Sequence, residues 1–167
     1  MADYNQHIQQ AKKNLSFLCS VNLQIPGSTD WQVTSAFYAA VHLMNARLAN
    51  IADHHYRSHE KVNDALNPFN ATPTALPEDE YLAYIILQNL ARRARYLCHH
   101  DKNKGGDRAH FTDVNHFVRA ITQLDILMRY MAATHAVDFE SYEINCAQID
   151  TIGLTYFSHL KVETVAE

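Results

Sequence analysis

The strongest chemical signal in the chain is a basic stretch with two histidines, LARRARYLCHH, which begins at residue 90. At 3.6 residues per turn the stretch predicts two adjacent helix faces: Arg92, Arg95 and His99 on one, and Arg93, Tyr96 and His100 on the other. Guanidinium groups attract phosphate, and a nearby imidazole is suited to acid or base chemistry in RNA cleavage. We therefore expect Arg92, Arg93, Arg95 and Tyr96 to attract a phosphate-bearing ligand and His99 or His100 to serve as the acid or base. The alternative is a solvated basic helix end that complements the helix dipole.

A second polar cluster lies around residues 54–63, and its members are His54, His55, Arg57, His59 and Asn63. His59 and Asn63 are four positions apart and so face the same way on a helix. With Arg57 they are candidate nucleotide-binding residues. His55 and His59 have the i, i+4 spacing of a metal pair, but Asn63 stands where an H-E-x-x-H pattern needs its second histidine. A loop followed by a helix cap is the competing interpretation.

The remaining histidines give no local metal motif. His42 lies on a stripe of small residues, and a single histidine on such a face is usually a hydrogen-bonded core or interface residue. A site formed by His42, His110 and His116 is the metal alternative, because ligands on facing helices need no local motif. The favoured interpretation has no metal and no cofactor.

The aromatic residues are interpreted as core. Trp31 and the tyrosines at 38, 81, 84 and 96 are expected in the interior rather than as stacking platforms for bases. The sequence contains no aromatic RNA-recognition motif, Walker loop or G-x-S-x-G turn. Nucleophilic serine or cysteine catalysis therefore has no supporting arrangement.

The composition is that of one globular domain. The 167 residues are 47% hydrophobic and 19% charged, which excludes a disordered chain. The formal charge of −4 argues against a broadly basic nucleic-acid coat but allows a local basic patch. Protonation of all eleven histidines would reverse the sign of that charge, so we expect charge-dependent behaviour to change between about pH 6 and 7.

The cysteines and the apolar runs bear on location. Cys19, Cys98 and Cys146 are far apart and include no C-x-x-C pair, which favours a reducing compartment. The first residues lack the apolar core of a signal peptide, and no run approaches the roughly 18 apolar residues of a membrane span. We expect a soluble, cytoplasmic protein without a membrane partner.

The elements that must position these residues are helices, because apolar residues recur at steps of three and four. The pattern predicts helices over about 3–23, 30–50, 58–66 and 77–100, and a fifth that begins after Thr112. The predicted N-caps are Asp3 with Gln6 in a capping box, Asp30, Ser58 and Thr112, while Pro77 suits a first turn. The second helix is apolar over much of its circumference and is expected to be central.

Residues 134–167 are ambiguous. A strand is indicated by alternating apolar residues at 152, 154, 156, 160 and 162, whereas Ile149, Ile152 and Tyr156 also fit a helix. We expect an irregular or partly β extension that packs on the bundle or on a partner. The predicted fold is an all-α, up-and-down bundle of four or five helices over residues 1–133, followed by this C-terminal extension at 134–167.

Three motifs in a fixed order resemble small prokaryotic HEPN (higher eukaryotes and prokaryotes nucleotide-binding) proteins. They are D-W-x5-F-Y-A-A-V-H at 30–42, R-S-H-E-K-V-N at 57–63 and L-A-R-R-A-R-Y at 90–96. The resemblance covers about residues 3–133 and implies a helical bundle that often forms a homodimer. Many HEPN members are RNA-cutting toxins or defence proteins, and others are non-catalytic binding modules.

Active HEPN members carry an arginine followed, after four to six residues, by a histidine, and paired motifs meet in a dimer cleft. Arg95 with His100, or Arg93 with His99, fits that count. The polar residue that usually follows the arginine is missing, since Tyr96 and Ala94 stand there. The resemblance thus implies binding of RNA or a nucleotide and metal-independent ribonuclease activity. The alternatives are a protein-interaction module, as the partner of a nucleotidyltransferase or defence protein, and a bundle with histidine-bound metal.

Overall fold

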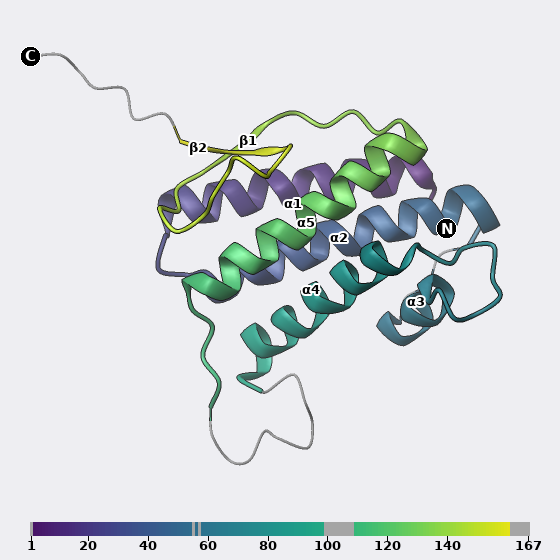
Figure 1. Cartoon of the computed structure of the whole chain (residues 1–167), viewed down its shortest axis with the longest axis horizontal. Helices are drawn as coiled ribbons and strands as arrows, with labels where there is room; N and C mark the ends of the chain where they lie inside the picture. The colour runs from purple at the N-terminus through teal and green to yellow at the C-terminus, as the bar shows by residue number, and fades with distance from the viewer. Residues whose placement is uncertain (1, 55, 57, 99–108, 161–167) are drawn as a thin grey trace, which may run out of the picture.

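The computed structural model describes residues 2–54, 56, 58–98 and 109–160, and these form five helices and two short strands. The elements are α1 (Tyr4–Gln24), α2 (Thr29–Ala52), α3 (His59–Leu66), α4 (Glu78–Tyr96), α5 (Val114–His135), β1 (Tyr142–Ile144) and β2 (Phe157–His159). The four long helices alternate in direction along the chain (Figure 1). The predicted all-α bundle with a partly β extension is confirmed. No helix in the described residues is long and apolar enough to cross a membrane.

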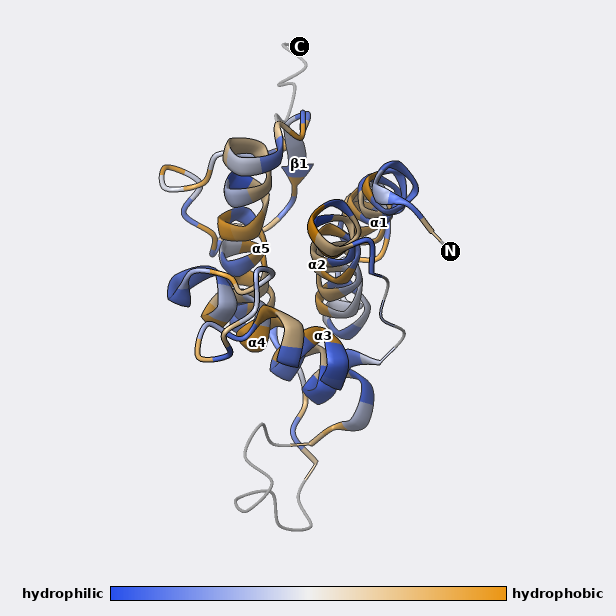
Figure 2. Cartoon of the chain, turned by 90° about the vertical axis from the view of Figure 1, so that its right-hand side faces the viewer, coloured by the Kyte–Doolittle hydropathy of each residue, from blue (hydrophilic) through white to orange (hydrophobic). Residues whose placement is uncertain are grey.

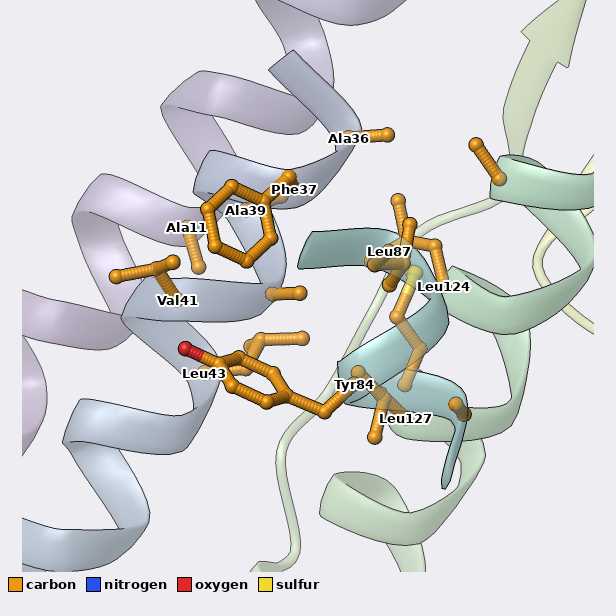
Figure 3. Close-up of a cluster of buried hydrophobic side chains, with 14 of the residues drawn as sticks. Ala11, Ala36, Phe37, Ala39, Val41, Leu43, Tyr84, Leu87, Leu124 and Leu127 are labelled. Atoms are coloured by element: carbon orange, nitrogen blue, oxygen red, sulfur yellow. The ribbon is translucent and has the colours of Figure 1, made fainter. Parts of the chain in front are cut away.

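Helix α2 forms the centre of the bundle, as predicted from its broad apolar surface. It packs against α1 on one side and against α4 and α5 on the other (Figure 2). Phe37 and Leu43 of α2 point into the space that α2 shares with α4 and α5, where they meet Tyr84, Leu87 and Leu124 (Figure 3). Burial of these large apolar side chains is the main source of stability in such a core.

Two predicted helix starts are displaced. Asp3 caps α1 in the predicted capping box with Gln6. Ser28 rather than Asp30 precedes α2, and Asp30 lies in the first turn, where a negative charge suits the helix dipole. Asp113 rather than Thr112 caps α5, because its carboxylate accepts hydrogen bonds from two free backbone N–H groups of the first turn. Aspartate, serine and threonine are all favourable N-cap residues, so sequence alone does not show which of two neighbouring candidates caps the helix.

Helix α4 ends at Tyr96, not near His100 as predicted. Leu97 has left-handed backbone angles (φ 51°), and its N–H closes the helix on the carbonyl oxygen of Arg93 at 2.8 Å. Glycine is the usual residue in that conformation, and because a leucine stands here the end of the helix could not be predicted from residue type. Ser58 and Pro77 occupy the cap positions of α3 and α4, each without a side-chain capping bond.

The C-terminal extension packs on the bundle. β1 and β2 are parallel, with Tyr142 opposite Phe157 and Ile144 opposite His159. The predicted alternation placed the even-numbered residues from 152 to 162 on the buried side of the strand. In the structure Phe157 is buried and Ile152 is exposed, so that prediction is out of register by one residue. β1 contacts α1, where the backbone N–H of Asn145 donates to the side chain of Asn22 at 2.6 Å.

Two buried charged groups hold segments that are distant in sequence. Asp125 of α5 accepts hydrogen bonds from the backbone N–H groups of Thr155 and Tyr156, and its second carboxylate oxygen contacts Nε of Arg129 at 3.2 Å. Asp125 therefore ties the extension to α5. The second group is Arg47 of α2, which is only 4% exposed.

Arg47 anchors the loop between α3 and α4. Its Nη2 donates to the carbonyl oxygen of Ala75 at 2.9 Å, and Nη1 donates to that of Thr74. Its Nε donates to the hydroxyl of Tyr130 at 3.0 Å, and the guanidinium lies 5.8 Å from the centre of that ring. Within the described residues no carboxylate pairs with Arg47, so carbonyl and phenol oxygens satisfy its charge.

Candidate functional site

Arg95 lies in the last turn of α4 with its guanidinium against two aromatic rings. Nε donates to the carbonyl oxygen of Ala91 at 3.2 Å, and Nη1 donates to the hydroxyl of Tyr38 on α2 at 3.4 Å. The guanidinium carbon lies 5.8 Å from the Tyr38 ring centre and 5.3 Å from that of Tyr96. Both distances are typical of cation–π contacts, which orient the cation without neutralising it.

His59 comes to the same place from another element. It is the first residue of α3, and its ring centre lies 5.2 Å from that of Phe37 in the core. Burial and, secondly, the positive charge of Arg95 lower the pKa of His59 from its usual 6.5. The imidazole is therefore neutral at pH 7 and able to accept a proton or a hydrogen bond. We call Tyr38, His59, Arg95 and Tyr96 the Arg95 cluster.

Asn63 lies one turn beyond His59 and links α3 to α4. Its Nδ2 donates to Oε1 of Gln88 at 2.8 Å. Its Oδ1 is buried and has no hydrogen-bond partner among the described residues. The structure therefore gives Asn63 a bridging contact beside the cluster and one unused acceptor.

The other arginines of the basic stretch flank the cluster. Both Arg92 and Arg93 are half-buried, and Nε of Arg93 donates to the carbonyl oxygen of Phe111 at 3.0 Å. In the described part of the chain the ion pairs are Asp113–His116 and Asp125–Arg129. None of the three arginines near the end of α4 is thus paired with a carboxylate in the described part of the chain, so no ion pair there offsets their charge.

Several predicted site residues cannot be placed. His99 and His100, the predicted catalytic histidines, lie outside the described residues, as do Arg57 and His55. Of the two predicted helical faces, α4 itself carries Arg92 and Arg95 on one and Arg93 and Tyr96 on the other. The structure brings together Arg95, Tyr96 and His59, which the sequence had placed in two separate clusters.

Other chemistries find less support. The described residues contain no group of three or more histidine, cysteine or acidic side chains placed to hold a metal ion. His42 lies 3.0 Å from His7, between their Nδ1 atoms, whereas His116 contacts Asp113. Burial, with a smaller contribution from Glu140, raises the pKa of Cys19 to about 11, which keeps this thiol protonated and unreactive.

The assignment of aromatic residues to the core was partly wrong. Tyr84 is fully buried, as expected, but Trp31 is 59% exposed, and Tyr38 and Tyr96 are exposed as well. The hydrophobicity of a residue does not show whether its face of the helix packs against another helix or is exposed to solvent. The spacing of Trp31 and Tyr38, seven positions apart and so on one face, was the available signal.

A concavity of about 430 Å³ lies between the end of α2, α3 and the loop after α3. Its lining includes Lys61 and Asp64, which are of opposite charge, beside the apolar side chains of Leu48 and Ala65. A recess of mixed charge is less suited to a phosphate than three unpaired guanidinium groups are. The Arg95 cluster is therefore the better candidate for an anionic ligand.

The fold and the cluster together define an all-α bundle with a basic and aromatic site at the junction of α2, α3 and α4. Comparison of the chain with protein-family models, with curated proteins and with solved structures finds no match.

Proposed function

We propose that the chain is a HEPN-like protein that binds RNA or a nucleotide, with a phosphate at the Arg95 cluster. The observation that carries the proposal is the state of Arg95. Its guanidinium is oriented by the Tyr38 and Tyr96 rings and has no carboxylate partner in the part of the chain that the structure describes. A positive charge held in place but left unneutralised is what binding of an anion requires.

The neighbouring groups support a phosphate-bearing ligand rather than a simple anion. Nη2 of Arg95 donates to no acceptor among the described residues and is available to a phosphate oxygen. The exposed ring of Tyr96 offers a surface on which a base can stack. Arg92 lies one turn away and adds positive charge. These features fit a nucleotide or a strand of RNA.

The HEPN resemblance extends the proposal to assembly and context. It implies a homodimer that acts in a toxin–antitoxin or defence system, and the spacing of the cysteines favours a cytoplasmic location. A non-catalytic module that binds a protein partner is the alternative within the same family. Sedimentation or light scattering of the purified chain tests the homodimer directly.

Substitution of Arg95 tests the binding proposal. We expect Arg95→Ala to weaken binding of a labelled single-stranded RNA, or of ATP, by about tenfold to a hundredfold, because charge-assisted hydrogen bonds contribute about 1.5–3 kcal/mol. Arg95→Lys keeps the charge but loses the planar donor array, so its loss should be smaller. Fluorescence anisotropy for the RNA and calorimetry for ATP measure both.

Arg119→Ala is the matched control, since Arg119 is exposed on α5 and outside the cluster. It should bind like the wild-type chain. Circular dichroism and urea denaturation establish that each variant is folded. Equal affinity of Arg95→Ala and wild type, or no binding of either ligand by the wild type, would contradict the proposal.

RNA cleavage is a second candidate function, favoured by His59, which lies at the start of α3 against Phe37 and has its pKa lowered by burial and, secondly, by the charge of Arg95. In metal-independent cleavage the ribose 2′-oxygen attacks the adjacent phosphorus, a base accepts the hydroxyl proton, and an acid protonates the leaving 5′-oxygen. The neutral imidazole of His59 is suited to act as the base, and the guanidinium of Arg95 is suited to bind the phosphate. His99 and His100 are the remaining candidates for the acid.

Cleavage should therefore depend on His59 and on pH. We expect wild type to cut single-stranded RNA in the presence of a chelator and His59→Ala to be roughly a hundredfold slower or worse, as is usual for loss of a general base. The pKa of His59 is lowered from 6.5, so the imidazole becomes protonated, and cleavage activity is lost, at a pH below 6.5. A gel assay of His59→Ala, His99→Ala and His100→Ala separates their roles. Cleavage unchanged in all three would remove these histidines from the mechanism, and no cleavage by wild type would favour the non-catalytic module.

A further inference from the structure

A groove of about 280 Å³ runs between α1 and α2 next to the Arg95 cluster. Its aromatic walls are Phe17 of α1 and Trp31 and Tyr38 of α2. These three side chains are 54%, 59% and 38% exposed, respectively, although each is large and apolar. Helix α1 packs along the small residues of α2, and the aromatic rings stand beside that contact instead of within it. They form an exposed apolar surface along a concavity, a common sign of a binding site.

Tyr38 belongs both to the groove and to the Arg95 cluster. Its ring lines the groove, and its hydroxyl accepts a hydrogen bond from Nη1 of Arg95 at 3.4 Å. The groove is thus continuous with the unpaired positive charge at the end of α4. A ligand whose phosphate contacts Arg95 places its next group at Tyr38 and then along the α1–α2 groove.

We propose that this groove binds the bases of single-stranded nucleic acid, which stack on Tyr38, Trp31 and Phe17 while a backbone phosphate contacts Arg95. This inference rests on the proposed function. It adds that the ligand is single-stranded and names the residues that contact its bases. Proteins that bind single strands combine a positive track with aromatic side chains in this way.

The polar groups of the groove fit base edges. Nε2 of Gln10 donates to Oδ1 of Asn14 at 3.1 Å, which leaves one amide oxygen and one amide nitrogen of the pair for a base. Among the described residues that line the groove there is no carboxylate, lysine or arginine, and there is one imidazole, that of His42. No carboxylate of this lining therefore repels a phosphate, and the guanidinium of Arg95 lies at the end of the groove that Tyr38 forms.

The charge and shape of the site favour a single strand over the other occupants. Bases in a duplex are stacked on each other and cannot offer their faces to Trp31. A second copy of this chain could cover the aromatic rings without using the positive charge of Arg95 beside them. Continuity with an unpaired guanidinium therefore argues for an anionic, aromatic ligand.

The chain has one tryptophan, Trp31, so its fluorescence reports directly on the groove. We expect a ten-nucleotide oligouridylate to quench Trp31 fluorescence in a saturable titration and the matching duplex to quench it far less. Trp31→Ala should weaken binding of the labelled oligonucleotide, measured by anisotropy, by roughly tenfold, as expected for loss of one stacked base. Trp31→Phe keeps a ring and should retain most of the affinity. Phe69→Ala, which removes an exposed aromatic side chain outside the groove, is the matched control.

The possible outcomes separate this inference from the binding proposal. RNA binding could require Arg95 and yet leave Trp31 fluorescence unchanged and be unaffected in Trp31→Ala. That result would refute base binding in the groove and would still support the phosphate site. Absence of both Arg95-dependent binding and quenching would overturn both. Equal quenching by duplex and single strand would refute the strand preference. A change of oligomeric state in Trp31→Ala without a change in RNA binding would assign the groove to a second copy of the chain.

Discussion

Replacement of Arg47 by alanine is expected to lower the free energy of unfolding by about 3–5 kcal/mol. The buried guanidinium contacts the carbonyl oxygens of Thr74 and Ala75 and the hydroxyl of Tyr130. Alanine would leave these acceptors without their donors and would also open a cavity between α2, α5 and the loop after α3. The loss should appear as a lower urea midpoint.

Two comparisons make the Arg47 result specific. Arg47→Lys keeps the charge but cannot reach all three oxygens, so it should fall between alanine and wild type. Arg119→Ala removes an exposed arginine and should stay within about 0.5 kcal/mol of wild type. Burial and, secondly, the charge of Arg47 lower the pKa of His135, so this pKa should rise in Arg47→Ala when followed by NMR. An unfolding free energy within 1 kcal/mol of wild type would contradict the anchoring role.

Replacement of Asp125 by alanine is expected to release the C-terminal extension and to destabilise the chain by about 3–5 kcal/mol. The carboxylate is fully buried and accepts hydrogen bonds from the N–H groups of Thr155 and Tyr156 at 2.8–3.2 Å. Without it these donors and Arg129 lose their acceptor. Asp125→Asn keeps the shape but turns one acceptor into a donor, so it should also weaken the contact.

Limited proteolysis and hydrogen exchange measure release of the extension. In Asp125→Ala the segment from residue 137 to 160 should be cut, and its amides should exchange, well before the helices do. Asp138→Asn is the control, because Asp138 is an exposed acid at the start of the same segment. Protection of β1 and β2 equal to that of wild type would show that apolar contacts alone hold the extension.

The helices were predictable from sequence because their apolar residues recur at helical spacing over many turns. Their ends were less predictable, since they depend on single residues: Leu97 adopts a left-handed conformation without being glycine, and Asp113 rather than Thr112 reaches the free N–H groups of α5. A strand in the extension was predicted, but its register was not. Ile152 and Phe157 are both apolar residue types, and sequence alone does not show that Ile152 is exposed while Phe157 is buried.

The candidate site was predictable in its parts and not in its assembly. Arg95 and His59 were each identified by residue type and spacing, but only the packing of α3 near α4 makes them neighbours. The role of Tyr38 was missed for the same reason. An aromatic residue is assigned to a core by its hydrophobicity, whereas the exposure of Tyr38 beside Arg95 depends on how α1 and α4 pack against α2.

The contact between Asn22 and Asn145 joins residues 123 positions apart. Closing so long a loop is entropically costly until the intervening helices are already in place. The α1–α2 hairpin, by contrast, is joined by a turn of only a few residues and its contacts are local. The order of folding follows: the hairpin forms early, α4 and α5 complete the core, and the extension is added last. Asn22→Ala, which removes the side chain that makes both hydrogen bonds to the backbone of Asn145, should therefore speed unfolding while leaving the rate of folding almost unchanged.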